Sequence, residues 1–214
     1  MQILERVFIV TGASSGIGLS TAVALAERGA KVALLARSDD APQKLAERLP
    51  DSLPVSVDMT QFDRVWEAVG AVHRHYGRVD GLINNAGRSY AASIEEIEPA
   101  IFDEIFHLNV LGPIVAMQSV IPLMRGQGCG CIVNINSGTA FMTIPTYGVY
   151  SSSKRALVGF SLRSGIWALL SMRCWGLRGA PRGLTEDLPT MVDRELWGSW
   201  LIWPLRSATT DQAD

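Results

Sequence analysis

The sequence has 214 residues, of which 48% are hydrophobic and 19% are charged, and its formal net charge is −2. These values fit one folded domain, exclude a disordered chain, and leave no basic excess for binding nucleic acid or an acidic membrane. The three cysteines lack a regular spacing. This argues against a disulfide-stapled secreted domain and, at Cys129 and Cys131, against a metal site, so we expect no metal.

From the N-terminus onward, short apolar runs alternate with segments of helical periodicity. The first residues lack the layout of a signal peptide, and no run approaches the roughly 18 apolar residues of a membrane helix. We therefore expect a cytoplasmic protein. Apolar, β-rich runs predict strands over residues 7–10, 32–35, 55–57, 79–83 and 131–135. Helical spacing predicts helices from about residue 19 to Gly29, over 42–49, 61–76 and 99–124 with a bend at Gly112–Pro113, and from 148 past 162.

This alternation predicts an α/β fold with a doubly wound parallel sheet of the Rossmann type. Right-handed crossovers bring the carboxyl ends of the strands to one edge of such a sheet, where ligands bind. Residues 11–18, 84–87 and 136–137 each follow a predicted strand. We expect these segments to meet at that edge.

A glycine-rich turn joins the first strand to the first helix at Gly12, Gly16 and Gly18. Glycines there permit positive φ and let backbone N–H groups approach a ligand, and the helix N-terminus attracts a pyrophosphate. The spacing differs from the G-x-G-x-x-G fingerprint of dinucleotide-binding turns. By itself the turn indicates either a phosphate cradle or a plain tight turn.

Tyr150 and Lys154 lie four residues apart on a predicted helix and therefore share one face. A nearby ammonium favours the phenolate and lowers the pKa of the phenol from its ordinary value of about 10, which improves proton transfer near neutral pH. Taken alone, such a pair is more often a surface pair than a catalyst.

Several features resemble those of the short-chain dehydrogenases/reductases, in the same order along the chain. They are TGASSGIG at Thr11–Gly18, NNAG at Asn84–Gly87, Asn109, Ser137, and YSSSK at Tyr150–Lys154. The resemblance spans about residues 5–164. It implies a Rossmann-like dinucleotide-binding and catalytic domain over residues 1–164, followed by an atypical tail over 165–214. It also implies an oxidoreductase that transfers a hydride between NAD(P) and a small carbonyl or alcohol substrate, and it allows a homo-oligomer.

The resemblance further implies a role for each matching residue. Tyr150 would be the general acid or base, and Lys154 would also hydrogen-bond the nicotinamide ribose. Ser137 would hold the substrate oxygen, and Asn109 would bind a water that links Lys154 to solvent. The expected cofactor-binding residues are Gly12, Ser14, Ser15, Gly16, Ile17, Gly18, Arg37, Asp58, Asn85, Ala86, Gly87, Tyr150 and Lys154.

The end of the second strand favours NADP(H) over NAD(H). NAD enzymes commonly place an acid there to bind the ribose 2′-OH, whereas this chain has Arg37, which suits a 2′-phosphate. Asp39 and Asp40 lie slightly farther along and leave NAD binding open. Asp58 resembles the family residue that contacts the adenine amino group, and the alternative is an N-cap for the following helix.

After Ser164 the sequence departs from the family pattern. The family continues with a sixth strand, a Pro-Gly turn and a seventh strand, whereas residues 165–183 contain neither a β-branched strand nor such a turn. We hypothesise that this tail is out of register with the ancestral coding frame or otherwise replaced, and we expect the last strands to be missing. The chain is then either an active reductase or a defective nucleotide-binding remnant. The short length and the glycine spacing count against a third reading, an extended-type sugar epimerase.

Overall fold

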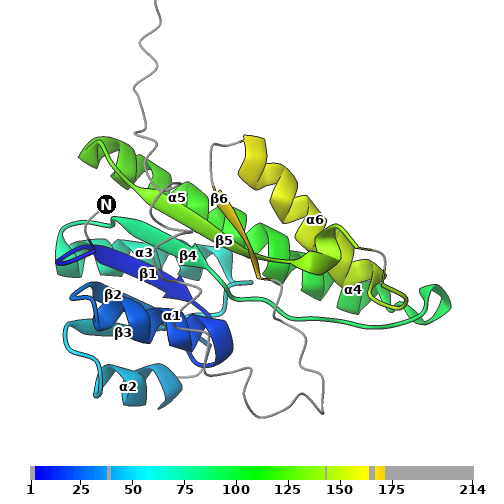
Figure 1. Cartoon of the computed structure of the whole chain (residues 1–214), viewed down its shortest axis with the longest axis horizontal. Helices are drawn as coiled ribbons and strands as arrows, with labels where there is room; N and C mark the ends of the chain where they lie inside the picture. Colours follow the sequence, from blue (N-terminus) through cyan, green and yellow to red (C-terminus); the bar gives the residue numbers. More distant parts are fainter. Residues whose placement is uncertain (1–2, 38–39, 143, 164–166, 172–214) are drawn as a thin grey trace, which may run out of the picture.

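The structure is a computed structural model that describes residues 3–37, 40–142, 144–163 and 167–171. Its centre is one parallel sheet with the strand order β3-β2-β1-β4-β5-β6 (Figure 1). The strands are β1 Val7–Thr11, β2 Lys31–Ala36, β3 Ser52–Ser56, β4 Gly81–Asn84, β5 Cys131–Ser137 and β6 Trp167–Ser171. Because β1 pairs with both β2 and β4, the order reverses between β1 and β4. The doubly wound parallel sheet predicted from the sequence is confirmed.

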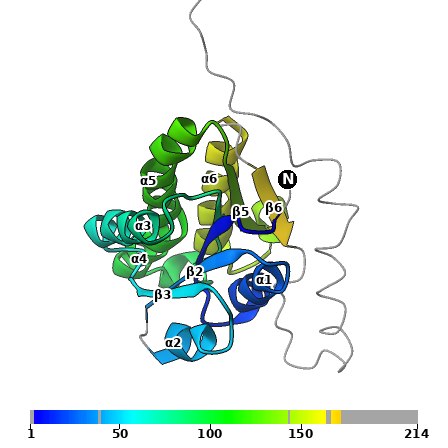
Figure 2. The same cartoon turned by 90° about the vertical axis from the view of Figure 1, so that its left-hand side faces the viewer.

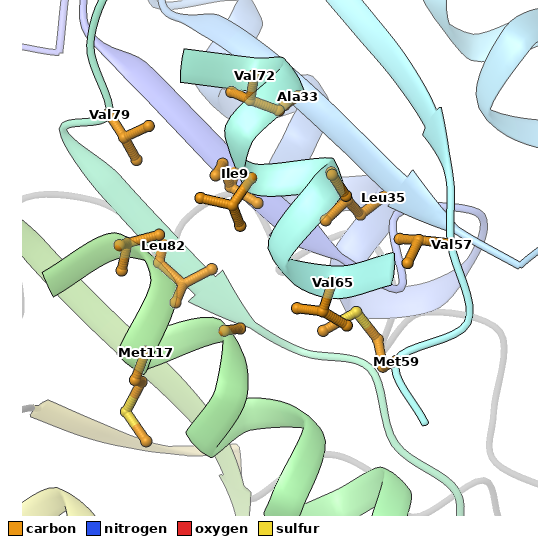
Figure 3. Close-up of a cluster of buried hydrophobic side chains, with 14 of the residues drawn as sticks. Ile9, Ala33, Leu35, Val57, Met59, Val65, Val72, Val79, Leu82 and Met117 are labelled. Atoms are coloured by element: carbon orange, nitrogen blue, oxygen red, sulfur yellow. The ribbon is translucent and has the colours of Figure 1, made fainter. Parts of the chain in front are cut away.

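Helices cover both faces of the sheet, which explains why the strands are apolar along their whole length. On one face lie α1 Gly16–Ala26 and α2 Asp40–Ala46, and on the other lie α3 Phe62–Tyr76, α5 Gly112–Gln127 and α6 Gly148–Arg163 (Figure 2). Alternate residues of β1 supply the two cores, since Ile9 packs with the α3 and α5 side chains and Val10 with the α1 side chains. Figure 3 shows Val65 and Val72 of α3 in one cluster with Ile9 and Leu35.

The third strand begins earlier than predicted, at Ser52 rather than residue 55. This strand includes Pro54, which cannot donate a backbone hydrogen bond. The strand tolerates it because β3 is at the edge of the sheet and pairs only with β2 among the described strands.

A sixth strand follows α6, and the prediction that this strand is missing is wrong. Residues Trp167–Ser171 pair in parallel with β5, from Val133 opposite Trp167 to Ser137 opposite Ser171. Pairing of backbone groups does not require β-branched side chains, so the strand was not visible in the composition. The expected absence of a seventh strand concerns residues beyond 171, which lie outside the described part of the chain.

The long helical region is divided by a π-helical segment. It comprises α4 Pro99–Phe106, the π segment η2 His107–Leu111, and α5. The sequence predicted a bend at Gly112–Pro113, whereas the departure from α-helical geometry is the π segment directly before these residues. Gly112 itself is needed for close packing, because a Cβ atom there would lie 2.7 Å from the Met59 carbonyl oxygen. By length and composition alone residues 99–127 could cross a membrane, but 56% of the most apolar window is buried inside the domain, as in a core helix.

Candidate active site

A cleft of about 850 Å³ opens at the carboxyl edge of the sheet. Its walls come from the β1–α1 turn, the end of β2, the segment after β4, the end of β5, and α6. Among the described residues that line it are all of the predicted cofactor-binding residues except Gly18 and Asp58. The three motif-bearing segments therefore meet at one edge, as the sequence predicted, and the cleft lies where the strand order reverses.

The glycine turn has its expected shape, and its glycines are required for different reasons. Gly16 has a φ of +56° and no heavy atom within 4 Å of the position of a Cβ, so its conformation requires glycine and the space beside it stays open. At Gly18, in contrast, a Cβ would lie 2.3 Å from the Gly12 carbonyl oxygen and 2.4 Å from Asn85 Nδ2. Gly18 therefore serves the packing of the turn rather than the wall of the cleft.

The segment after β4 is fastened to this turn by hydrogen bonds. Thr11 Oγ1 accepts from the backbone N–H groups of Asn85 and Ala86, each at 3.0 Å. Asn85 Nδ2 donates to the carbonyl oxygens of Thr11 and Gly12 at 3.0 and 3.2 Å. The side chain of Asn85 thus stabilises the conformation of the glycine turn, and the residue also lines the cleft.

Tyr150 and Lys154 both line the cleft from α6, as their spacing predicts. Lys154 is 5% exposed, its Nζ donates to the Ile135 carbonyl oxygen at 2.9 Å, and Nζ lies 6.0 Å from the centroid of the Tyr150 ring. A Cβ on Gly87 would lie 3.5 Å from Nζ, so the NNAG segment passes close to this ammonium. The structure therefore places a buried cation beside the phenol ring.

Asn109 lies in the π segment η2, is fully buried, and joins two walls of the cleft. Its Oδ1 accepts from Arg88 N at 2.9 Å, and its Nδ2 donates to Arg88 O at 2.9 Å and to Ser153 Oγ at 3.0 Å. Ser153 Oγ in turn donates to the Tyr150 carbonyl oxygen at 2.7 Å. Both amide protons of Asn109 are thus bonded to protein atoms, and a relay water could reach its side chain only through Oδ1.

Ser137, the predicted partner of the substrate oxygen, is 5% exposed at the end of β5 and is not among the residues that line the cleft. Its Oγ accepts from Thr139 N at 3.3 Å and from Thr139 Oγ1 at 3.0 Å. These bonds cap the short 3₁₀ turn η3 Gly138–Ala140. Its hydroxyl proton is not used by either of these two bonds.

At the opposite end of the cleft, Arg37 is exposed and lines the wall at the end of β2. Asp58 does not line it, and its Oδ1 accepts from Thr60 N and Thr60 Oγ1 at 2.9 and 2.8 Å. These bonds form a local turn before α3. The N-cap of that helix is Gln61, so the N-cap foreseen for Asp58 is wrong, and the adenine contact stays a prediction. Asp39 lies outside the described residues.

Sequence reasoning missed the positions of Thr11, Ser153 and Asn136. Each lies inside or beside a motif that the sequence singled out, but a short polar side chain next to a motif does not show which way it points. Asn136 lines the cleft beside Tyr150 and Lys154. Within the described residues no group of His, Cys, Asp and Glu side chains could hold a metal ion.

Comparison with known proteins gives consistent matches. The family description that matches this chain is "short chain dehydrogenase", over residues 6–164. An uncharacterized oxidoreductase of Bacillus subtilis, YxjF, is 31% identical over 198 residues, which cover 90% of this chain and 73% of that protein. The crystal structure of a short-chain dehydrogenase from Streptomyces avermitilis superposes with a TM-score of 0.74 at 33% identity, over 80% of this chain and 66% of the other. An NAD⁺-bound xylitol dehydrogenase gives a TM-score of 0.74 at 30% identity, over 77% and 65%.

Proposed function

Because this chain belongs to the short chain dehydrogenase family, we propose that it is an enzyme that transfers a hydride between a nicotinamide dinucleotide and the carbonyl or alcohol carbon of a small molecule. The family match over residues 6–164 confirms the resemblance drawn from the motifs, and the relatives are oxidoreductases. The observation that carries the proposal is one cleft that joins the glycine turn at one end to Tyr150 and Lys154 at the other.

The cleft fits such a cofactor. The open space beside Gly16 faces the turn at the start of α1, where backbone N–H groups and the helix N-terminus favour a pyrophosphate. Its volume of about 850 Å³ is within the range of cofactor pockets. Ser14, Ser15, Ile17, Asn85, Ala86 and Gly87 line the cleft and would hold the dinucleotide there. When bound, the dinucleotide supplies the hydride.

The protein's own part is to move one proton and to hold the reacting oxygen. Tyr150 would give its phenolic proton to the carbonyl oxygen during reduction, or accept the alcohol proton during oxidation. The buried Lys154 ammonium beside the ring would favour the phenolate, and Ser137 would donate a hydrogen bond from its hydroxyl group to the substrate oxygen. Asn109 would act mainly by position, because its carboxamide connects the Arg88 loop to the Tyr150 helix.

NADP(H) is the proposed cofactor, since Arg37 lines the cleft where an NAD enzyme commonly has an acid. The guanidinium can pair with a 2′-phosphate through two hydrogen bonds. In an Arg37→Ala variant we expect the Kd for NADPH to rise at least about tenfold with the Kd for NADH little changed, because a charge-assisted bond contributes roughly 1.5–3 kcal/mol. Equal effects on the two cofactors would contradict this assignment.

The function is tested with purified protein, NADPH and a panel of carbonyl compounds. Turnover by the wild type that is lost in Tyr150→Phe, with cofactor binding kept, supports the proposal. Tyr147→Phe is the matched control. The Tyr147 ring packs edge-on against the Tyr150 ring, with 6.3 Å between the ring centroids, and Tyr147 is not among the residues that line the cleft. Cofactor binding with no turnover on any carbonyl would instead identify a defective remnant, and thermal stabilisation by NADPH separates binding from turnover.

A further inference from the structure

Asn136 is a buried carboxamide at the catalytic end of the cleft to which neither motif nor family match gives a role. It is the second-last residue of β5 and is 1% exposed. It lines the cleft together with Ile135, Tyr150 and Lys154. The residue is therefore shielded from bulk water and borders the cleft that a ligand would fill.

The hydrogen bonding of Asn136 fixes which end of the carboxamide is the donor. Oδ1 accepts from the backbone N–H of Ser137 at 2.9 Å. A backbone N–H can only donate, so the bonded atom must be the oxygen and the other must be the NH₂ group. This Nδ2 atom is buried and has no hydrogen-bond partner among the described residues.

The other buried carboxamides nearby use their NH₂ groups. Asn134, two residues earlier in β5, donates from Nδ2 to Ser161 Oγ at 2.9 Å, and Asn109 donates from Nδ2 to two acceptors. Of the buried side-chain atoms without a partner in the described part of the chain, only Asn136 Nδ2 belongs to a residue that lines the cleft. A buried donor without an acceptor is unfavourable, so a ligand that supplies an acceptor there gains affinity.

We propose that Asn136 Nδ2 donates a hydrogen bond to an oxygen atom of the molecule bound at the Tyr150–Lys154 end of the cleft. This inference rests on the proposed function, which provides two sources for that oxygen. One is the nicotinamide-ribose part of the dinucleotide, and the other is the carbonyl or hydroxyl group of the substrate. Asn136 is then a ligand-binding residue that selects an oxygen acceptor, because a donor or an apolar group at this place would leave its N–H groups unpaired.

Two variants test the inference. Asn136→Asp keeps the shape and the oxygen that accepts from Ser137 N–H, but it replaces the donor with an acceptor. Asn136→Ala removes the donor without adding a negative charge near Lys154, and it keeps the test valid if the aspartate variant does not fold. The matched control is Ser151→Ala, because Ser151 Oγ is also buried without a partner among the described residues but faces a separate cavity of about 220 Å³.

The measurements are the Kd for NADPH by fluorescence titration and the kcat and KM for a carbonyl substrate at saturating NADPH, with a melting curve to confirm folding. A Kd raised roughly 10- to 100-fold in both variants identifies the dinucleotide as the source of the oxygen. An unchanged Kd with kcat/KM lowered by the same factor identifies the substrate. Ser151→Ala is expected to leave both within about twofold of the wild type.

Unchanged Kd and kcat/KM in folded Asn136 variants would overturn the inference. Equal changes in the Ser151→Ala control would also overturn it, because they would show a general effect of altering buried polar groups. If the wild type binds NADPH but reduces no carbonyl, the proposed function fails separately, and the Kd decides the inference alone. An unchanged Kd would then count against it.

Discussion

Replacing Asp80 with asparagine should destabilise the fold from the end of the sheet opposite the cleft. The Asp80 carboxylate is 1% exposed and lies just before β4. It accepts from Arg6 Nη1 at 3.0 Å, from Arg78 Nε and Nη2 at 2.7 and 2.5 Å, and from the Val7 backbone N–H at 3.0 Å. These bonds fasten the start of β1 to the start of β4, so their loss should weaken the centre of the sheet.

The magnitude follows from the exposure of the partners. Removing one member of a buried ion pair costs about 3–5 kcal/mol when the remaining charge stays buried. Here the side chains of Arg6 and Arg78 are 35% and 40% exposed, so water can partly replace the lost carboxylate. Asparagine also keeps one acceptor oxygen. We therefore expect a loss of about 2–3 kcal/mol in the free energy of unfolding. For a domain of this size that lowers Tm by roughly 4–12 °C.

The loss should depend on pH in a defined direction. Burial by itself would raise the pKa of the Asp80 carboxyl, but the hydrogen bonds and charge of Arg78, with bonds from Val7 and Arg6, hold that pKa below its usual range. The folded-state pKa is then lower than the unfolded value of about 3.9. The stabilisation is therefore fully present above about pH 4–5 and disappears as the pH falls through the folded-state pKa. The difference between wild type and variant should shrink in acid.

Urea denaturation of wild type and Asp80→Asn at a series of pH values from 7 downward measures both quantities. Glu67→Gln is the control, because Glu67 pairs with Arg64 on the surface and both side chains are more than half exposed. It should change the urea midpoint little at any pH. The reasoning is refuted if Asp80→Asn has the wild-type midpoint at pH 7, or if its deficit does not decrease in acid.

Three further predictions concern the glycine turn between β1 and α1 and the cysteines. Gly16→Ala should cost about 1–2 kcal/mol of stability through its positive φ and should also abolish tight NADPH binding, because the methyl group enters the open space beside the turn. Gly128→Ala is the control, because Gly128 has a φ of +71° and equally open surroundings. This variant should lose stability in urea denaturation but bind NADPH like the wild type. Loss of NADPH binding in both variants would disprove the steric argument. Thr11→Val should cost about 2–3 kcal/mol, measured as a urea midpoint, because two backbone N–H groups after β4 lose their acceptor; a midpoint equal to the wild type would show that water replaces it. Iodoacetamide at pH 8 should modify the exposed Cys129 and spare Cys131, because burial raises the pKa of the Cys131 thiol to about 11. Peptide mass spectrometry of the folded protein measures this, and modification of Cys131 before Cys129 would contradict it.

Local patterns in the sequence determined most of the secondary structure and the position of the cleft. Apolar runs marked the first five strands, and a parallel sheet brings the ends of such strands to one edge. The glycine turn and the four-residue spacing of Tyr150 and Lys154 are properties of neighbouring residues, so they could be interpreted without the fold. The start of the edge strand β3 and the whole of β6 were not predicted, because pairing with a neighbouring strand outweighed weak local preferences.

Only the tertiary structure decided how the polar side chains around the cleft are used. Asn109 is bonded to Arg88 and Ser153, which are 21 and 44 residues away, and Thr11 holds backbone groups more than 70 residues away. The unpaired donor of Asn136 likewise depends on which elements pack around β5. Residue type states what each side chain can donate or accept, but the partners come from distant segments. A single sequence therefore predicts the place of this site better than the hydrogen bonds within it.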